Sequence, residues 1–210
     1  MKKWILCMLS GGLDSTGALY KVLEDEQYKD LSIHVHSMGL NNVEGRAGAE
    51  FEAVMNIRKW FQKNYPDREL IFTRSQFEYN FQGTNFMWDA DMTAFWSAQI
   101  IRCDPTRTYA FRIVGRTKTD TDVDNFDFRG RVERALEIYD VTWGRLIKKE
   151  KPATIVPVAD MYKREIWDML PPDLRELTWS CRTPKQDEKS NWIPCENCIT
   201  CRDIRDMFDE

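Results

Sequence analysis

The sequence predicts an α/β protein with a mostly parallel five-stranded sheet and helices on both faces of that sheet. Short apolar runs alternate along the chain with segments in which apolar residues recur at helical spacing, a pattern typical of parallel sheets wrapped by helices. A glycine-rich turn joins the first apolar run to the first helical pattern. Hydrophobic residues form 42% and charged residues 30% of the 210 residues, which suits one substantial core with a small appendage.

The predicted strands are short runs rich in apolar and β-branched residues. Residues 4–9 form a continuous apolar run, which is typical of a buried strand. Residues 31–38 alternate in the way expected of a second strand. In chain order, the strands are expected at 4–9, 31–38, 69–75, 108–115 and 153–160.

The predicted helices follow these strands and carry apolar residues three or four positions apart. In the first helix these residues are Leu19, Val22 and Leu23. The last helix is ended by Pro171 and Pro172, because a proline lacks the backbone N–H that a continuing helix needs. The helices are expected at 15–23, 47–61, 89–103, 132–139 and 163–171.

The charge and hydropathy of the chain argue against two broad classes of partner. A net charge of −4 argues against nucleic-acid binding, because a phosphate footprint normally needs a basic face. No stretch of the sequence reaches the roughly 18 apolar residues of a membrane span. We therefore expect a cytoplasmic protein with no membrane partner.

The turn between the first strand and the first helix has the composition of a phosphate site. Gly11 and Gly12 allow the backbone to approach a ligand and to turn its N–H groups inward above a helix N-terminus. Asp14 is placed to cap that helix. A tight turn without a ligand is the alternative, and the absence of a lysine excludes a Walker A sequence. The hydroxyl donors in this segment are Ser10, Ser15 and Thr16.

The segment SGGLDST resembles the signature of the N-type ATP pyrophosphatases, the PP-loop family. The resemblance implies an adenine nucleotide alpha hydrolase-like fold that binds the β- and γ-phosphates of ATP and breaks the bond at the α-phosphorus. Adenylation of a substrate is the chemistry that follows. The ATP-binding residues implied by the resemblance are Ser10, Gly11, Gly12, Leu13, Asp14, Ser15, Met38 and Gly115.

Four of the six cysteines crowd the C-terminal segment, at positions 181, 195, 198 and 201. Four thiolates with short spacings complete a tetrahedral zinc shell, and the same set could hold an iron–sulfur cluster. Free thiols or disulfides are the remaining alternative, although disulfides are rare in a reducing cytoplasm. Cys7 and Cys103 are interpreted as core residues, and His34 and His36 as packing residues on one strand face. The predicted metal ligands are Cys181, Cys195, Cys198 and Cys201.

Helical patterning ends near residue 178 and gives way to a polar, cysteine-rich segment. We therefore predict a nucleotide-binding α/β domain at 1–177 and a zinc-binding tail at 178–210. Metal binding would supply folding energy to a tail that has few apolar residues of its own.

An N-terminal SGGxDS motif combined with a C-terminal four-cysteine knuckle resembles the 7-cyano-7-deazaguanine synthase family of queuosine biosynthesis. FQGTNFMW keeps the glycine and asparagine of a family loop but has Thr84 in place of its arginine, and the segment after the second strand departs further, keeping a glycine and Arg46. The other positions that match family landmarks are Gly83, Asn85, Gly115, Thr119, Asp120, Asp127, Arg129 and Lys163.

This resemblance implies an ATP-dependent ligase that converts 7-carboxy-7-deazaguanine and ammonia to 7-cyano-7-deazaguanine through adenylated intermediates. It also implies a homodimer, with ATP, Mg²⁺ and Zn²⁺ as cofactors. Asp14 or Asp120 would hold Mg²⁺, Lys163 would neutralise charge on the departing pyrophosphate, and Asp127 and Arg129 would grip the substrate.

Two other functions remain open from the sequence. One is a PP-loop enzyme that modifies tRNA by thiolation and whose cysteines hold an iron–sulfur cluster. The other is a non-catalytic relative that binds a nucleotide through the same loop. The intact SGGLDS segment argues against the second of these, whereas the altered segment at 36–50 favours it.

Overall fold

A central parallel sheet organises the chain, as the sequence predicts. The computed structural model describes residues 2–78, 88–118, 126–144 and 149–208, with 126–129 described for their backbone alone. All four neighbouring strand pairs are parallel, in the spatial order β3-β2-β1-β4-β5. The strands are β1 (Lys3–Met8), β2 (Ser32–Asn41), β3 (Leu70–Glu78), β4 (Thr108–Ile113) and β5 (Ala153–Ile155).

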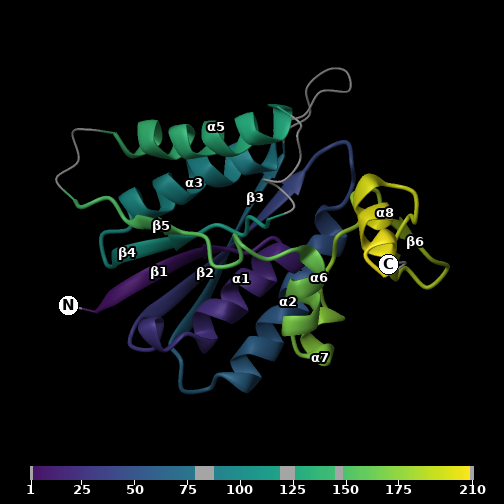
Figure 1. The fold of residues 1–210 in the computed structure, drawn as a ribbon, viewed down its shortest axis with the longest axis horizontal. Coiled ribbons are helices and arrows are strands. Elements are labelled where there is room, and N and C mark those ends of the chain that lie inside the picture. The colour runs from purple at the N-terminus through teal and green to yellow at the C-terminus, as the bar shows by residue number, and fades with distance from the viewer. Residues whose placement is uncertain (1, 79–87, 119–125, 145–148, 209–210) are drawn as a thin grey trace.

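Helices cover both faces of this sheet (Figure 1). On one face, a hydrophobic core lies between the sheet and the helices α1 (Leu13–Glu24), α2 (Ala47–Asn64) and α6 (Lys163–Met169). On the opposite face, a second core lies between the sheet and the helices α3 (Asp89–Cys103) and α5 (Phe126–Trp143).

Strand β1 lies between the two cores, which explains its unbroken apolar sequence. Trp4 and Leu6 pack towards α3 and α5, whereas Ile5 and Cys7 pack towards α1 and α2. The interpretation of Cys7 as a core residue is confirmed, and burial raises the pKa of its thiol to about 12. The same interpretation is wrong for Cys103, which is exposed because it ends α3 at the rim of the domain.

Several element bounds differ from the sequence-based expectation. β2 continues to Asn41 and α5 runs from Phe126 to Trp143, whereas β5 is short because the chain turns at Val156–Ala159. Pro172 ends one helix but also starts another, since proline suits the first position of a helix. The elements that local patterns did not predict are η1 (Glu26–Tyr28), α7 (Pro172–Arg175), β6 (Lys185–Gln186), β7 (Trp192–Ile193) and α8 (Ile199–Asp206).

The C-terminal segment folds into a small antiparallel hairpin, β6 and β7, followed by α8. It lies at one end of the domain, beyond α2 and α6 (Figure 1). Its Trp192 ring covers Gly48 so closely that a Cβ there would lie 2.5 Å from the ring. The boundary between 177 and 178 stays a prediction. Every helix within the described ranges is too short or too polar to cross a bilayer.

The packing of α1 on α6 depends on a residue without a side chain. A Cβ on Gly17 would overlap the Cγ2 methyl of Ile166, which is fully buried. We expect Gly17→Ala to lower the free energy of unfolding by about 1–3 kcal/mol, because overpacking outweighs the better helix propensity of alanine. Urea unfolding followed by circular dichroism measures the change.

Gly130→Ala in α5 is the matched control, since a Cβ there meets nothing within 4 Å. We expect Gly130→Ala to leave the urea midpoint of unfolding unchanged or to raise it. An unchanged midpoint for Gly17→Ala would show that the two helices separate easily.

Candidate functional site

The turn between β1 and α1 lies at the carboxyl edge of the sheet, where ligands of such folds bind. Gly11 has a φ of +85°, and a Cβ there would lie 3.1 Å from the carbonyl oxygen of Glu50 in α2. Both facts require glycine. Gly12 is the N-cap of α1 and has no side chain to offer, so the expectation that Asp14 caps the helix is wrong. Asp14 instead lies in the first turn of α1, where a carboxylate suits the helix dipole.

Serine hydroxyls fix the shape of this turn. The Oγ of Ser15 lies 3.2 Å from the backbone nitrogen of Ser10, whose N–H donates to it, and 3.0 Å from the Oγ of Ser10. The Ser10 Oγ in turn accepts from the N–H of Gly12 at 3.3 Å. Thr16 is fully buried on the inner side of the helix. The two serines therefore orient the backbone amides of the turn.

Gly115 lies directly against the start of α1. A Cβ at this position would be 2.9 Å from both the nitrogen and the Cα of Ser15. The chain after β4 can cross the glycine turn only because residue 115 has no side chain. The structure thus brings Gly115 to the predicted phosphate site, although its role in ATP binding stays a prediction.

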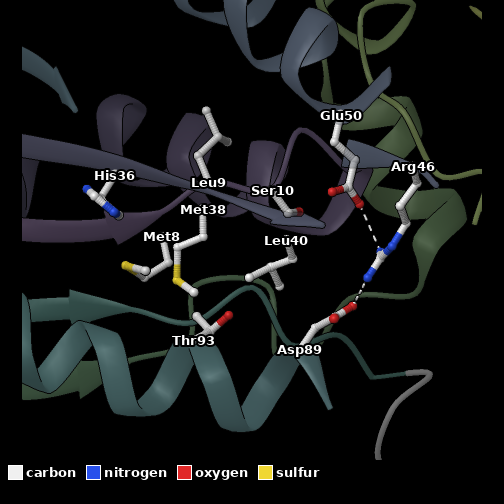
Figure 2. Close-up of a pocket in the computed structure, with 10 residues that line it drawn as sticks. All are labelled: Met8, Leu9, Ser10, His36, Met38, Leu40, Arg46, Glu50, Asp89 and Thr93. Carbon is white, nitrogen blue, oxygen red and sulfur yellow. Dashed lines mark hydrogen bonds and ion pairs between the residues drawn. The ribbon is translucent and has the colours of Figure 1, made fainter. Parts of the chain in front are cut away.

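A hollow of about 60 Å³ opens beside the turn (Figure 2). Ser10 from the turn and Met38 from β2, both predicted to bind ATP, line it together. Its other walls come from α2, α3 and the loop before α2. Figure 2 shows Glu50 and Asp89 approaching the guanidinium of Arg46 from two sides.

Arg46 is the centre of a buried charge cluster that sequence reasoning missed. Its Nε lies 2.8 Å from Glu44 and its Nη1 2.8 Å from Glu50, while its Nη2 pairs with Asp89. Burial opposes the charge of Arg46, but the three carboxylates together hold its pKa above the ordinary range. Burial raises the pKa of Glu50 to about 7. A signal was present in the sequence, because Glu44 lies two residues before Arg46 and Glu50 four residues after it, but Asp89 is 43 positions away.

Arg182 adds a second cation to this cluster from the C-terminal tail. Its Nε and Nη2 lie 2.7 and 3.0 Å from the two carboxylate oxygens of Glu44, a bidentate pair. Its Nη2 is also 3.8 Å from Asp89. The charge cluster of Arg46, Arg182, Glu44, Glu50 and Asp89 therefore joins the hollow to the tail.

The four C-terminal cysteines meet in one group, with their sulfur atoms all within 4.8 Å of one another. A tetrahedron of zinc–sulfur bonds of about 2.3 Å separates its sulfurs by about 3.8 Å, so this donor set fits one ion. Backbone N–H groups of Arg182, Cys195 and Cys198 donate to sulfurs of the group at 3.2–3.4 Å. The hydroxyl of Thr183, together with backbone N–H groups, lowers the pKa of Cys195 to about 5, whereas burial raises the pKa of Cys181 and of Cys201. The thiolate, which is the form that binds metal, is therefore favoured at Cys195 but not throughout the group.

The structure gives less information about the remaining predicted residues. Lys163 begins α6, and its Nζ is 3.6 Å from Asp203 in α8, so it faces the tail. Asp127 and Arg129 lie in the first turn of α5, with side chains outside the description. Gly83, Thr84, Asn85, Thr119 and Asp120 lie outside the described residues. The roles of all these residues stay predictions.

His34 and His36 form a directional chain of hydrogen bonds under α3. The hydroxyl of Tyr109 donates to the carboxylate of Asp104, so its oxygen accepts from Nδ1 of His34 at 2.6 Å. Nε2 of His34 then accepts from the hydroxyl of Thr73, whose oxygen accepts from Nδ1 of His36 at 2.7 Å. Burial disfavours the charged form of both rings, and neutral rings in this chain carry the proton on Nδ1, which agrees with a packing role.

Comparisons with known proteins support the fold. No family model and no curated protein matches the sequence. Among solved structures, the chain is similar to the U34-tRNA thiolase NcsA from Methanococcus maripaludis with its [4Fe–4S] cluster, at a TM-score of 0.51 and 17% identity. The match covers 99% of this chain but only 64% of the thiolase chain. The likeness shows that this chain shares the parallel α/β fold of that structure.

Burial lowers the pKa of both His34 and His36 to about 4. We expect neither Cε1–H resonance to shift appreciably between pH 5.5 and 8 in the folded protein, because this range begins about 1.5 pH units above the folded pKa values. Unfolded histidines take up protons below about pH 6.5, so these two residues lower stability as pH falls from about 6.5 to about 4.

NMR titration is the appropriate measurement, because it follows each histidine separately. A measurement of global stability would also include the raised pKa of Glu50, which increases stability as pH falls and so opposes the effect of the histidines. The chain has only these 2 histidines, so His36→Asn assigns both signals. A titration midpoint above pH 6 in the folded protein would contradict the hydrogen-bond chain.

We expect Cys198→Ala to reduce the metal content of the purified protein at least about tenfold, because three remaining thiolates cannot complete the shell. Plasma mass spectrometry measures zinc and iron together. Cys103→Ala is the control, since Cys103 is exposed on α3 and lies outside the group. Full metal content in Cys198→Ala would contradict a four-cysteine site.

Proposed function

We propose that this protein is an ATP-dependent enzyme that adenylates its substrate. The observation that supports this best is the glycine turn at the carboxyl end of β1, with Gly11 at positive φ and Gly12 as the N-cap of α1. The first amides of a helix have no partner within the helix, and its dipole attracts anions. A polyphosphate is therefore the ligand that suits this turn.

The turn contains no lysine, which agrees with bond cleavage at the α-phosphorus. An oxygen of the acceptor attacks that phosphorus, the bond to the β-phosphate breaks, and pyrophosphate leaves while the turn holds it. The acceptor then carries AMP. Asp14, in the first turn of α1, is the described candidate for holding Mg²⁺, which would offset phosphate charge.

Two acceptors remain, each with its own support. The fold likeness to a U34-tRNA thiolase supports thiolation of tRNA, and it supports this better than it supports nitrile formation. The sequence motifs support 7-carboxy-7-deazaguanine with ammonia. The distances between the four sulfurs support nitrile formation with a zinc ion. Four cysteines that bind the separate irons of a four-iron cluster lie farther apart than four cysteines that bind one ion.

One assay tests adenylation and separates the two acceptors. The protein is mixed with ATP and Mg²⁺, in one arm with ammonium and 7-carboxy-7-deazaguanine, and in the other with tRNA and sulfide. Mass spectrometry detects AMP and either the nitrile or a thiolated nucleoside. We expect AMP in one arm, and loss of at least about 90% of it in Ser15→Ala, whose hydroxyl orients the turn.

Metal analysis of the same preparation adds a second readout. Iron with absorbance near about 400 nm accompanies the thiolation outcome, whereas a colourless zinc protein accompanies the nitrile outcome. ATP binding without AMP in either arm would contradict adenylation and favour a non-catalytic nucleotide-binding protein.

A further inference from the structure

Arg182 is tied at once to the cysteine group and to the hollow beside the glycine turn. Its backbone N–H donates to the sulfur of Cys198 at 3.4 Å. Its guanidinium grips Glu44, which also pairs with Arg46 in the wall of the hollow. One residue therefore connects a sulfur ligand to a charge beside the predicted phosphate site, across 138 positions of sequence.

A second connection is made by a tail residue three positions before Arg182. The backbone N–H of Trp179 donates to the carbonyl of Gly11 at 2.8 Å, and its indole Nε1 donates to the carbonyl of Cys181 at 3.0 Å. The peptide at Gly11 is thus held by the same segment that enters the cysteine group.

Few apolar side chains of this segment are buried. Among the described residues from 178 to 208, Cys181 is the one with a buried side chain. Apart from hydrogen bonds, surface ion pairs and ring contacts such as that of Trp192 over Gly48, the hairpin and α8 contribute little burial of their own. Loss of a metal would remove one of the constraints that hold the backbone beside Arg182 in position.

The local charge balance makes that position important for an anionic ligand. The cluster contains two arginines, Arg46 and Arg182, against three carboxyl groups, those of Glu44, Glu50 and Asp89. Without Arg182, a single arginine faces all three carboxyl groups at the wall that Ser10 shares. A polyphosphate would then meet a more negative surface.

We propose that Arg182 is a positioning residue that couples the metal centre to nucleotide binding. A metal on the four cysteines holds Arg182 against Glu44, which balances the acidic wall and keeps Arg46 in place; release of the metal frees Arg182 and weakens nucleotide affinity. Because coupling is reciprocal, nucleotide binding also slows metal release. This inference rests on the proposed ATP-binding function.

The test compares variants by calorimetric titration with α,β-methylene-ATP and Mg²⁺, with metal content measured on each sample. We expect Arg182→Gln to keep its metal and to bind the nucleotide about tenfold more weakly. The double variant Arg182→Gln with Glu44→Gln also lacks the carboxylate that Arg182 pairs with. We therefore expect its nucleotide affinity to lie within about threefold of wild type. Arg205→Gln is the matched control in α8, since Arg205 is exposed and its ion pair is with Asp206.

The outcomes separate this inference from the proposed function. Failure of the wild-type protein to bind the nucleotide would overturn the proposed function. Normal binding by metal-loaded Arg182→Gln, or no recovery in the double variant, would overturn the coupling alone. If Arg182→Gln loses its metal, the rate of metal release from the wild-type protein to a chelating dye is measured with and without nucleotide. We expect nucleotide to slow this release at least about threefold, and an unchanged rate would overturn the coupling.

Discussion

The close approach of backbone to backbone at the end of β1 is the constraint on which the rest of the structure depends. Gly11 lies against the backbone of α2, and Gly115 lies against the backbone of α1. A side chain at either position would push apart the elements that surround the turn. The absence of Cβ atoms thus permits the tight packing of the carboxyl edge and the backbone conformation of the glycine turn.

The C-terminal tail extends this arrangement through ion pairs and hydrogen bonds. The first core holds α1 and α2 on the sheet through buried aliphatic and aromatic residues, whereas the tail has a group of four sulfurs and an arginine that reaches back to Glu44. A bidentate ion pair fixes both the distance and the orientation of its partners. A metal bound by the four sulfurs would act on the wall of the hollow through this pair.

Residues with strong local signals were placed correctly by sequence reasoning. The apolar run of β1, the bounds of α3 and the proximity of the four cysteines follow from short-range pattern and spacing. Cys103 was misplaced because its apolar neighbours belong to the buried side of α3, while its own side chain falls on the exposed side. Asp14 was misplaced as a cap because α1 begins two residues earlier than its apolar pattern does.

The sequence by itself determined the alternation of strands and helices, the glycine turn and the spacing of the four cysteines, since each depends on residues close together in the chain. The tertiary structure decided that Arg46 is buried among three carboxyl groups and that Arg182 adds a second cation to them. Ion pairs between distant segments depend on how helices and loops pack around the sheet, and no local periodicity encodes that packing.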